Sequence, residues 1–443
     1  MSSSELEPAE SLLDFIDASP SPYHAVAEAA RRLRAAGFVE LDAAATWTNG
    51  GACFVISGGA LVAWSAPRGR PELPLRMIAA HTDSPNLRLK PRPDRSTAGF
   101  RQLAIEPYGG LLLNSWLDRD LGLSGRVVVR SDDGARVVLV RDDRALLRVP
   151  QLAIHLDRGV NESGLVLDPA RHLTPVWGTG HSDEGDFARW LAALLTRTLD
   201  GDVTPGDVLG WDLMLHDVAP ASFLGHDADL ISASRLDNLC SCYGAITALI
   251  GAGEPIQSDD VAASSVRVAA LFDHEEVGSE SATGASGTFL AHALERMVGA
   301  RGGGRDDWLR ALADSRVLSA DMAHGTHPNY PERHDPDHRV IVGGGPVIKV
   351  NVNQRYASDA PGAAEFRLAC ETASVPVQVY AHRNDLPCGS TIGPITAAGL
   401  GVNVVDVGMA QLAMHSAREL MGRSDVAAMV AAFGAWLDLA PAS

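Results

Sequence analysis

The fold is decided by the stretch Val266-Arg267-Val268-Ala269-Ala270-Leu271-Phe272-Asp273-His274-Glu275-Glu276. Its first seven residues are mainly apolar and predict a buried strand, and a pair of glutamates follows shortly after that strand. In open α/β sheets the active site lies in the crevice at the carboxyl ends of the strands. The stretch therefore predicts an α/β sheet with Glu275 and Glu276 at its active-site edge.

Four further stretches place a carboxylate or an imidazole beside apolar runs in the same way. They are His81-Thr82-Asp83 after a predicted strand over 75–80, Ser234-Arg235-Leu236-Asp237-Asn238 before an apolar helix over 239–249, Ser319-Ala320-Asp321 after Val317 and Leu318, and Met414-His415 after a strand over 402–407. We expect a helix to begin near Ala410 and to carry His415. Ligand-type side chains that recur at strand ends indicate one shared pocket.

The order of these side chains, His, Asp, Glu-Glu, Asp, His, can supply a site for two metal ions. Such a site needs one carboxylate that bridges the ions and further ligands on each of them. Asp237 is the predicted bridge; the other predicted ligands are Glu276 and His415 for one ion, and Asp321 and His81 for the other. Imidazole and carboxylate ligands around an open position suit catalytic zinc, so we expect two Zn²⁺ per subunit, with Mn²⁺ or Co²⁺ as substitutes.

Two further residues complete the predicted chemistry. Asp83 follows His81 by two residues and is placed to accept the second imidazole N–H, which would fix the tautomer of that ligand. Glu275 lies beside the ligand Glu276 but outside the ligand set, and it is the predicted general base that takes a proton from a bridging water. The residues thus predict a two-metal hydrolase.

Composition excludes several classes of partner. The 443-residue chain has 37 basic and 55 acidic residues and a net charge of −18, which argues against nucleic acid. Its first residues include Glu5, Glu7 and Glu10 but no basic and apolar signal pattern, and no later segment approaches the roughly 20 apolar residues of a membrane span. We expect a cytoplasmic protein whose five cysteines are reduced.

The segment between about residues 91 and 225 has short alternating strands in place of the α/β pattern. Residues 127–130 and 137–140 flank Ser131-Asp132-Asp133-Gly134, which predicts a β-hairpin. Because His81 precedes this segment and the other ligands follow it, the catalytic domain must be discontinuous. The predicted organisation is a mixed-sheet α/β metallopeptidase domain with helices on both faces, in residues 1–92 and 229–443, and an inserted β-rich domain in residues 93–228.

The chain resembles the aspartyl aminopeptidase family of zinc metallopeptidases with two catalytic ions. The similar stretches are Ser19 to Val26, His81 to Pro85, Ala153 to Leu156, Ser234 to Asn238, Asp273 to Ser279, Asn351 to Tyr356 and Cys388 to Gly393. The resemblance implies removal of an N-terminal Asp or Glu from peptides, with the ligands and the base already derived. It also implies that the inserted domain mediates dimerisation, that the dimers build a dodecamer, and that Asp237-Asn238 is a cis peptide.

The same resemblance assigns the substrate-binding residues. Lys349 is the implied cation for the acidic side chain, because a buried carboxylate must be paired, and Tyr356 is an implied partner of the substrate or of the tetrahedral intermediate. His155, in a strand-like context that would otherwise suggest a half-buried structural residue, is implied to reach the active site of a neighbouring subunit. A competing ligand set of His81, His155 and His415 leaves the carboxylates unexplained.

Two alternative functions are open at this point. The first is the same dizinc mechanism with preference for neutral residues such as Leu, which a Lys349→Ala variant would separate from the acidic preference. The second, from a different class, is a non-catalytic assembly protein with degenerate metal sites. That second alternative predicts a missing ligand or base, and the sequence lacks none of them.

Overall fold

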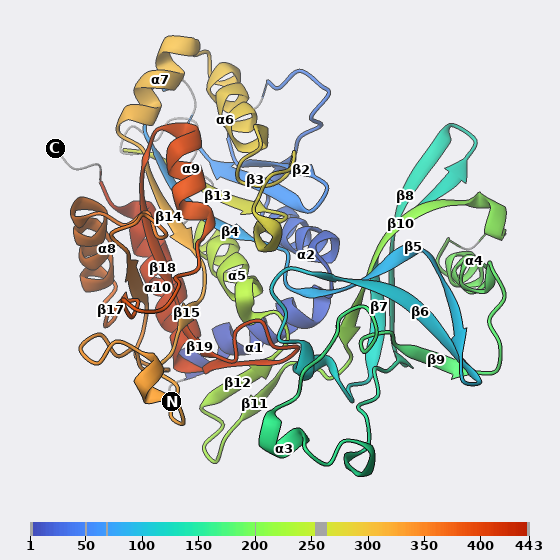
Figure 1. Cartoon of the computed structure of the whole chain (residues 1–443). Helices are drawn as coiled ribbons and strands as arrows, with labels where there is room; N and C mark the ends of the chain where they lie inside the picture. Colours follow the sequence, from blue (N-terminus) through green and yellow to red (C-terminus); the bar gives the residue numbers. More distant parts are fainter. Residues whose placement is uncertain (1–2, 49–50, 68–69, 200, 253–263, 441–443) are drawn as a thin grey trace. The chain divides into compact units, whose positions relative to one another are not determined.

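The computed structural model describes residues 3–48, 51–67, 70–199, 201–252 and 264–440 (Figure 1). The chain divides into two compact units. The first comprises Met1–Asp83, Ala221–Met414 and Glu419–Ser443, and the second comprises Ser84–Pro220 and His415–Arg418. The unit that contains most of the predicted ligands is therefore discontinuous in sequence, whereas His415 is grouped with the second unit.

A nine-stranded mixed sheet forms the centre of the first unit, in the order β1-β2-β3-β13-β4-β14-β18-β16-β17. The strands are β1 (Val39–Glu40), β2 (Cys53–Ser57), β3 (Ala60–Ser65), β4 (Leu75–His81), β13 (Val266–Phe272), β14 (Arg316–Ala320), β16 (Val347–Val350), β17 (Gln378–Ala381) and β18 (Asn403–Gly408). Four neighbours, β13, β4, β14 and β18, are parallel. Their carboxyl ends therefore share one edge of the sheet.

Helices cover both faces of this sheet, as the sequence predicted (Figure 1). Because side chains alternate along a strand, Ile78 and Ala80 join one apolar core and Met77 and Ala79 join the other. The first core is packed by α1 (Ser3–Ala18), α2 (Pro22–Ala35), α5 (Leu236–Gly251), α8 (Ala360–Thr372) and α10 (Ser424–Asp438), and the second by α6 (Phe289–Ala300), α7 (Arg305–Ala313) and α9 (Ile392–Leu400). The predicted α/β fold is confirmed.

A smaller sheet of the first unit has the order β11-β12-β20-β19-β15. Its strands are β11 (Ser222–Leu224), β12 (Leu230–Ala233), β15 (Ala323–His324), β19 (Ala410–Leu412) and β20 (Glu419–Gly422). The prediction of a helix that begins near Ala410 is therefore wrong, because Ala410–Leu412 is a strand. Residues 410–412 pair with β20 as an extended strand, and His415 lies in the connection between these strands with a positive φ of 67°, which an α-helix does not allow.

The second unit is built on a six-stranded antiparallel sheet in the order β8-β7-β10-β5-β6-β9. The strands are β5 (Asn86–Thr97), β6 (Phe100–Tyr108), β7 (Leu121–Ser131), β8 (Gly134–Leu147), β9 (Val176–Thr179) and β10 (Val208–Asp217), with helices α3 (Val160–Ser163) and α4 (Asp186–Leu199). β7 and β8 form the predicted hairpin, with Ser131 paired to Gly134. Among the described residues, no helix combines the length and the apolar composition that crossing a membrane requires.

A buried ion triad links the central sheet to α8. The Arg76 guanidinium on β4, only 1% exposed, donates to Glu365 Oε2 at 2.6 Å, and Arg316 Nε on β14 donates to Glu365 Oε1 at 3.1 Å. Removing one partner of a buried ion pair leaves a desolvated charge. Glu365→Ala is therefore expected to lower the free energy of unfolding by about 3 to 5 kcal/mol in chemical denaturation.

The matched control for that measurement is Glu295→Ala. Glu295 pairs with Arg305 at 2.8 Å, but the two side chains are 38% and 65% exposed. An exposed pair contributes about 0 to 1 kcal/mol. Equal losses in the two variants would contradict a special role for the buried triad.

Candidate metal centre

Parallel pairing of β13, β4 and β14 brings the predicted ligands together. His81 is the last residue of β4 and is paired with Phe272, the last residue of β13. Ser319 on β14 is paired with Ala79, so the register brings Asp321, two residues further on, level with His81. Glu275 and Glu276 follow β13 in a short 3₁₀ turn, Glu275–Val277. Sheet register therefore explains why these distant residues converge.

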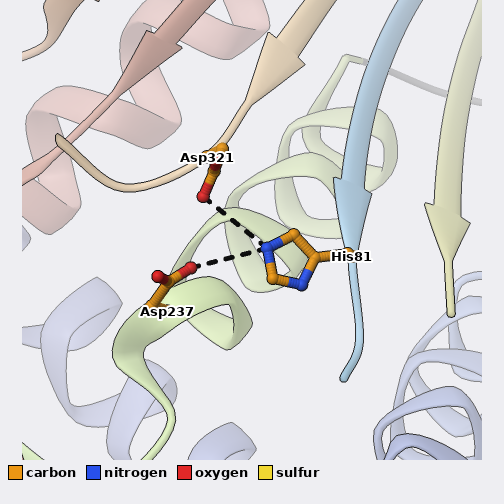
Figure 2. A group of neighbouring side chains, drawn as sticks. All are labelled: His81, Asp237 and Asp321. Atoms are coloured by element: carbon orange, nitrogen blue, oxygen red, sulfur yellow. Dashed lines mark ion pairs between the residues drawn. The ribbon is translucent and has the colours of Figure 1, made fainter. Parts of the chain in front are cut away.

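His81, Asp237 and Asp321 form the centre of the cluster (Figure 2). The Nε2 atom of His81 lies 3.5 Å from Asp237 Oδ1 and 3.6 Å from Asp321 Oδ1. All three residues are buried, with exposures of 1%, 3% and 8%. One ligand atom from each lies within 4.8 Å of the others, and the same holds for His81 with Glu275 and Glu276.

Asp83 organises the other side of His81. Nδ1 of His81 lies 3.0 Å from the backbone carbonyl oxygen of Asp83 and 3.4 Å from its carboxylate, so the carbonyl is the closer acceptor. The fully buried Asp83 carboxylate also accepts the backbone N–H groups of Glu275 and Glu276, at 3.0 and 3.1 Å. Asp83 therefore orients both the imidazole and the glutamate pair.

Asp237 is positioned by an irregular entry into α5. Arg235 before it has a left-handed φ of 59°, and the Asp237-Asn238 peptide is cis, as the resemblance implied. The Asn238 side chain donates from Nδ2 to the carbonyl oxygen of Ala320 at 2.8 Å. Since Ala320 precedes Asp321, Asn238 connects the Asp237 and Asp321 segments directly.

Burial and mutual charge set the ionisation of the cluster. Burial alone would lower the pKa of His81, but hydrogen bonds to the carboxylates of Asp237 and Asp321 raise that pKa well above its ordinary value. Burial raises the pKa of Glu275 to about 7; the His81 charge opposes this shift, whereas Asp321 and Asp83 add to it. A metal ion bound by His81 would therefore have to displace a proton from the imidazole.

The donor set fits a divalent metal. It combines one imidazole nitrogen, aimed at two carboxylate oxygens, with the two further carboxylates of Glu275 and Glu276. Buried carboxylates at such density repel one another unless cations neutralise them, and imidazole with carboxylate is a ligand combination that zinc accepts. The geometry thus brings together side chains that could hold a divalent metal ion.

Lys349 and Tyr356 lie next to this cluster. Lys349 on β16 is 1% exposed, so it is not a surface lysine at a strand edge. Its Nζ donates to the carbonyl oxygens of Asp321 and Met322, at 2.9 and 3.2 Å, and lies 3.4 Å from Asp321 Oδ2. The Tyr356 ring centroid is 5.1 Å from Nζ, and burial raises the pKa of Tyr356 so that its phenol stays protonated.

Sequence reasoning missed Asp406, a fully buried carboxylate on β18. It accepts the hydroxyls of Ser319 at 2.6 Å and Thr391 at 2.7 Å, and it also accepts the backbone N–H of Ala357. It thereby ties together the segments that precede Asp321 and follow Tyr356. A lone aspartate within the apolar run of residues 402–407 was the available signal.

His415 and His155 both belong to the second unit. Nδ1 of His415 lies 3.0 Å from the carbonyl oxygen of Gly110 in that unit. His155 is exposed and lies in a 3₁₀ turn, Ile154–Leu156. The strand context and half-burial that its neighbours suggested are therefore wrong, because three exposed residues in a turn bury no face.

A family model and the sequences of known proteins both match this chain, and both point to the same family. Residues 15–437 match the family described as Aminopeptidase I zinc metalloprotease (M18). The chain is 52% identical over 420 residues to a probable M18 family aminopeptidase 2 of Streptomyces avermitilis, covering 94% of each chain. It is also 52% identical over 435 residues to the protein of the same name from Mycobacterium tuberculosis strain H37Rv, covering 97% of this chain and 98% of that one.

Solved structures show the same fold. In a structure titled as the Ape4 and Nbr1 complex, one chain superposes with a TM-score of 0.93 at 37% identity, over 98% of this chain and 86% of that chain. Aminopeptidase mApe1 from Saccharomyces cerevisiae, solved as a dodecamer, superposes with a TM-score of 0.82 at 28% identity, over 97% of each chain. With a family match over nearly its whole length and its histidine and carboxylate cluster at the parallel strand ends, the chain belongs to the M18 family of zinc aminopeptidases.

Proposed function

We propose that this aminopeptidase removes an N-terminal Asp or Glu from peptides at a centre of two zinc ions. The observation that carries the acidic preference is Lys349, a buried ammonium 3.4 Å from the carboxylate of Asp321. An ammonium has three donors, and two of them are used by backbone carbonyl oxygens. The third donor faces Asp321 Oδ2 at 3.4 Å, longer than a usual hydrogen bond, so an acidic side chain of the substrate could compete for it.

The proposed ligands are those derived from the sequence: His81, Asp237, Glu276, Asp321 and His415. His415, in the second unit, is proposed on the strength of its sequence context. When bound, zinc polarises the peptide carbonyl and lowers the pKa of water to about 7. The size of the donor set supports two ions, because five ligands with three carboxylates exceed what one tetrahedral zinc site uses.

Glu275 is the proposed general base. Its carboxylate lies within the ligand cluster, and its backbone is held by Asp83. A carboxylate in this position can accept a proton from the attacking water and later deliver it to the leaving amine. Tyr356, kept neutral by burial, can donate a hydrogen bond to the substrate or to the oxyanion that forms on the scissile carbonyl.

The experiment that tests this function is release of the first residue from matched peptides that begin with Asp, Glu or Leu. An N-acetylated Asp peptide is the control for exopeptidase action. Fast release of Asp and Glu from the free peptides alone supports the proposal. Preferred release of Leu would keep the metal chemistry but remove the acidic specificity, and absence of release would contradict the proposed function.

Lys349→Met is expected to lower kcat/KM for Asp peptides about 10- to 100-fold with little change for Leu peptides, because a hydrogen bond to a charged group contributes about 1.5 to 3 kcal/mol. The ratio of the two kcat/KM values is the measurement. Since Lys349 also contacts Asp321, the zinc content of the variant must be measured together with this ratio. Equal losses for both peptides would contradict a role in side-chain recognition.

We also propose that the second unit mediates self-association. The segment that carries His155 has exposed apolar side chains, namely Leu152, Ile154, Leu156 and Val166 with exposures of 58%, 45%, 75% and 84%, and Leu152 and Val166 line the same surface pocket. An apolar patch of this kind favours protein contact, and the dodecamer of the yeast relative supports a second copy as the partner. In such an assembly His155 is the proposed contribution of one subunit to the active site of its neighbour.

Leu156→Asp is expected to lower the molar mass measured by light scattering, because a charge in an apolar interface must be desolvated. Val137→Asp is the matched control, since Val137 on β8 is 58% exposed and lies outside the patch. An unchanged molar mass of the Leu156 variant would contradict the proposed interface.

A further inference from the structure

Glu419, the first residue of β20, is a buried carboxylate that the proposed chemistry does not use. Its side chain is 3% exposed. Its Oε2 accepts the backbone N–H of Asp237 at 3.0 Å, and its Oε1 accepts the side-chain amide of Gln411 at 3.3 Å. Burying a charged carboxylate is costly, so its placement against the backbone of a proposed metal ligand requires an explanation.

The start of α5 explains why Asp237 needs this acceptor. Backbone N–H groups in the first turn of a helix have no partner within the helix and usually depend on a side-chain cap. Here the cap position is Arg235, which gives no side-chain cap hydrogen bond, and Asp237 itself has non-helical angles of −81° and 105°. Glu419 supplies the missing acceptor from a different strand.

Glu419 is itself held in a fixed position. β20 pairs with β12, the strand that leads into α5, and Glu419 is opposite Ala233 in this register. On the other side of Asp237, the Asn238 side chain is bonded to the carbonyl oxygen of Ala320. The bridging candidate Asp237 therefore lies between two anchors, one to the smaller sheet and one to the central sheet.

We infer that Glu419 is a positioning residue of the metal centre, which fixes the backbone of Asp237 and adds negative charge that favours bound cations. The inference rests on the proposed two-metal site. Partners outside the ligand set that orient metal ligands typically contribute 10- to 100-fold in metal affinity. The role of Glu419 is thus expected to appear in zinc affinity and not only in fold stability.

The test compares Glu419→Ala, Glu419→Gln and the wild type. Zinc affinity is measured by competition with a chromogenic chelator, and thermal unfolding is measured on the metal-free proteins. We expect zinc binding to weaken about 10- to 100-fold in E419A. In E419Q the amide oxygen can still accept from Asp237 while the charge is lost, so we expect a measurable but smaller loss of zinc affinity, about tenfold.

Asp425→Asn is the matched control for burial of a carboxylate. Asp425 on α10 is fully buried and accepts the backbone N–H groups of Gly343 and Gly345, at 2.8 and 2.9 Å, neither of which is a proposed ligand. This variant is expected to unfold at a lower temperature and to keep its zinc affinity. The comparison separates loss of a buried carboxylate in general from loss of the contact to Asp237.

Wild-type zinc affinity in E419A, with a lowered unfolding temperature like that of D425N, would overturn the inference. If E419A does not fold, the zinc affinity of E419Q is the deciding measurement. Unchanged zinc affinity in E419Q would also overturn the inference. Failure of the wild-type protein to bind zinc would instead remove the proposed metal centre, on which the inference depends.

Discussion

Replacing Glu275 by Gln is expected to lower kcat about 10²- to 10⁴-fold, because Gln keeps the size of the side chain but cannot accept the proton of the attacking water. Its backbone N–H is held by Asp83 at 3.0 Å, so the turn that carries it should keep its position. Zinc content and thermal unfolding should stay near those of the wild type. The loss should appear in kcat with acidic peptides at saturating concentration.

The matched control is Glu280→Gln. Glu280 lies five residues further along the same segment but is exposed to solvent. This variant should release Asp at the wild-type rate. Loss of zinc from E275Q would show that Glu275 acts as a ligand, and an unchanged kcat would contradict its role as the base.

Asp237→Ala is expected to have the second large effect on activity, because the variant should lose bound zinc. As the proposed bridge, Asp237 would be a ligand of both ions. Its removal should therefore weaken zinc binding by more than the 10- to 100-fold typical of a residue that only orients a ligand. We expect zinc content, measured on protein purified without added metal, to fall to one ion or fewer per chain and peptide release to fall with it.

Asp227→Ala is the corresponding control, since its side chain is 78% exposed and forms an ion pair with His226, which is also exposed, at 3.7 Å. It should retain the zinc content and activity of the wild type. Full zinc content in D237A would contradict the bridging assignment and would favour ligation by a different set, such as the three histidines.

Much of the first unit could be predicted from the sequence because its strands are short apolar runs that end directly at polar residues. The strands that became β4, β13 and β14 were predicted from this pattern, and parallel pairing then brings His81, Asp321 and the glutamates together. The predicted helices on both faces are consistent with these continuous apolar runs, because a strand that is apolar on both sides must be covered on both sides. The local sequence pattern was thus sufficient to predict a buried strand where the strand ends close to a proposed ligand.

Prediction from the sequence failed where tertiary contacts determine the conformation and override the local sequence pattern. Residues 410–412 have helix-compatible side chains, yet they pair with β20, and His415 takes a left-handed conformation that only its surroundings specify. The supporting carboxylates Asp406 and Glu419 were also missed. Each acts through backbone or hydroxyl groups far away in sequence, and such contacts leave no periodic signal.

The most direct test of the proposed two-metal mechanism is a zinc titration of the metal-free chain that follows release of Asp from a peptide. We expect activity to rise until two equivalents of Zn²⁺ per chain are bound and then to reach a plateau. A plateau at one equivalent, with no further change at the second, would contradict the two-metal mechanism.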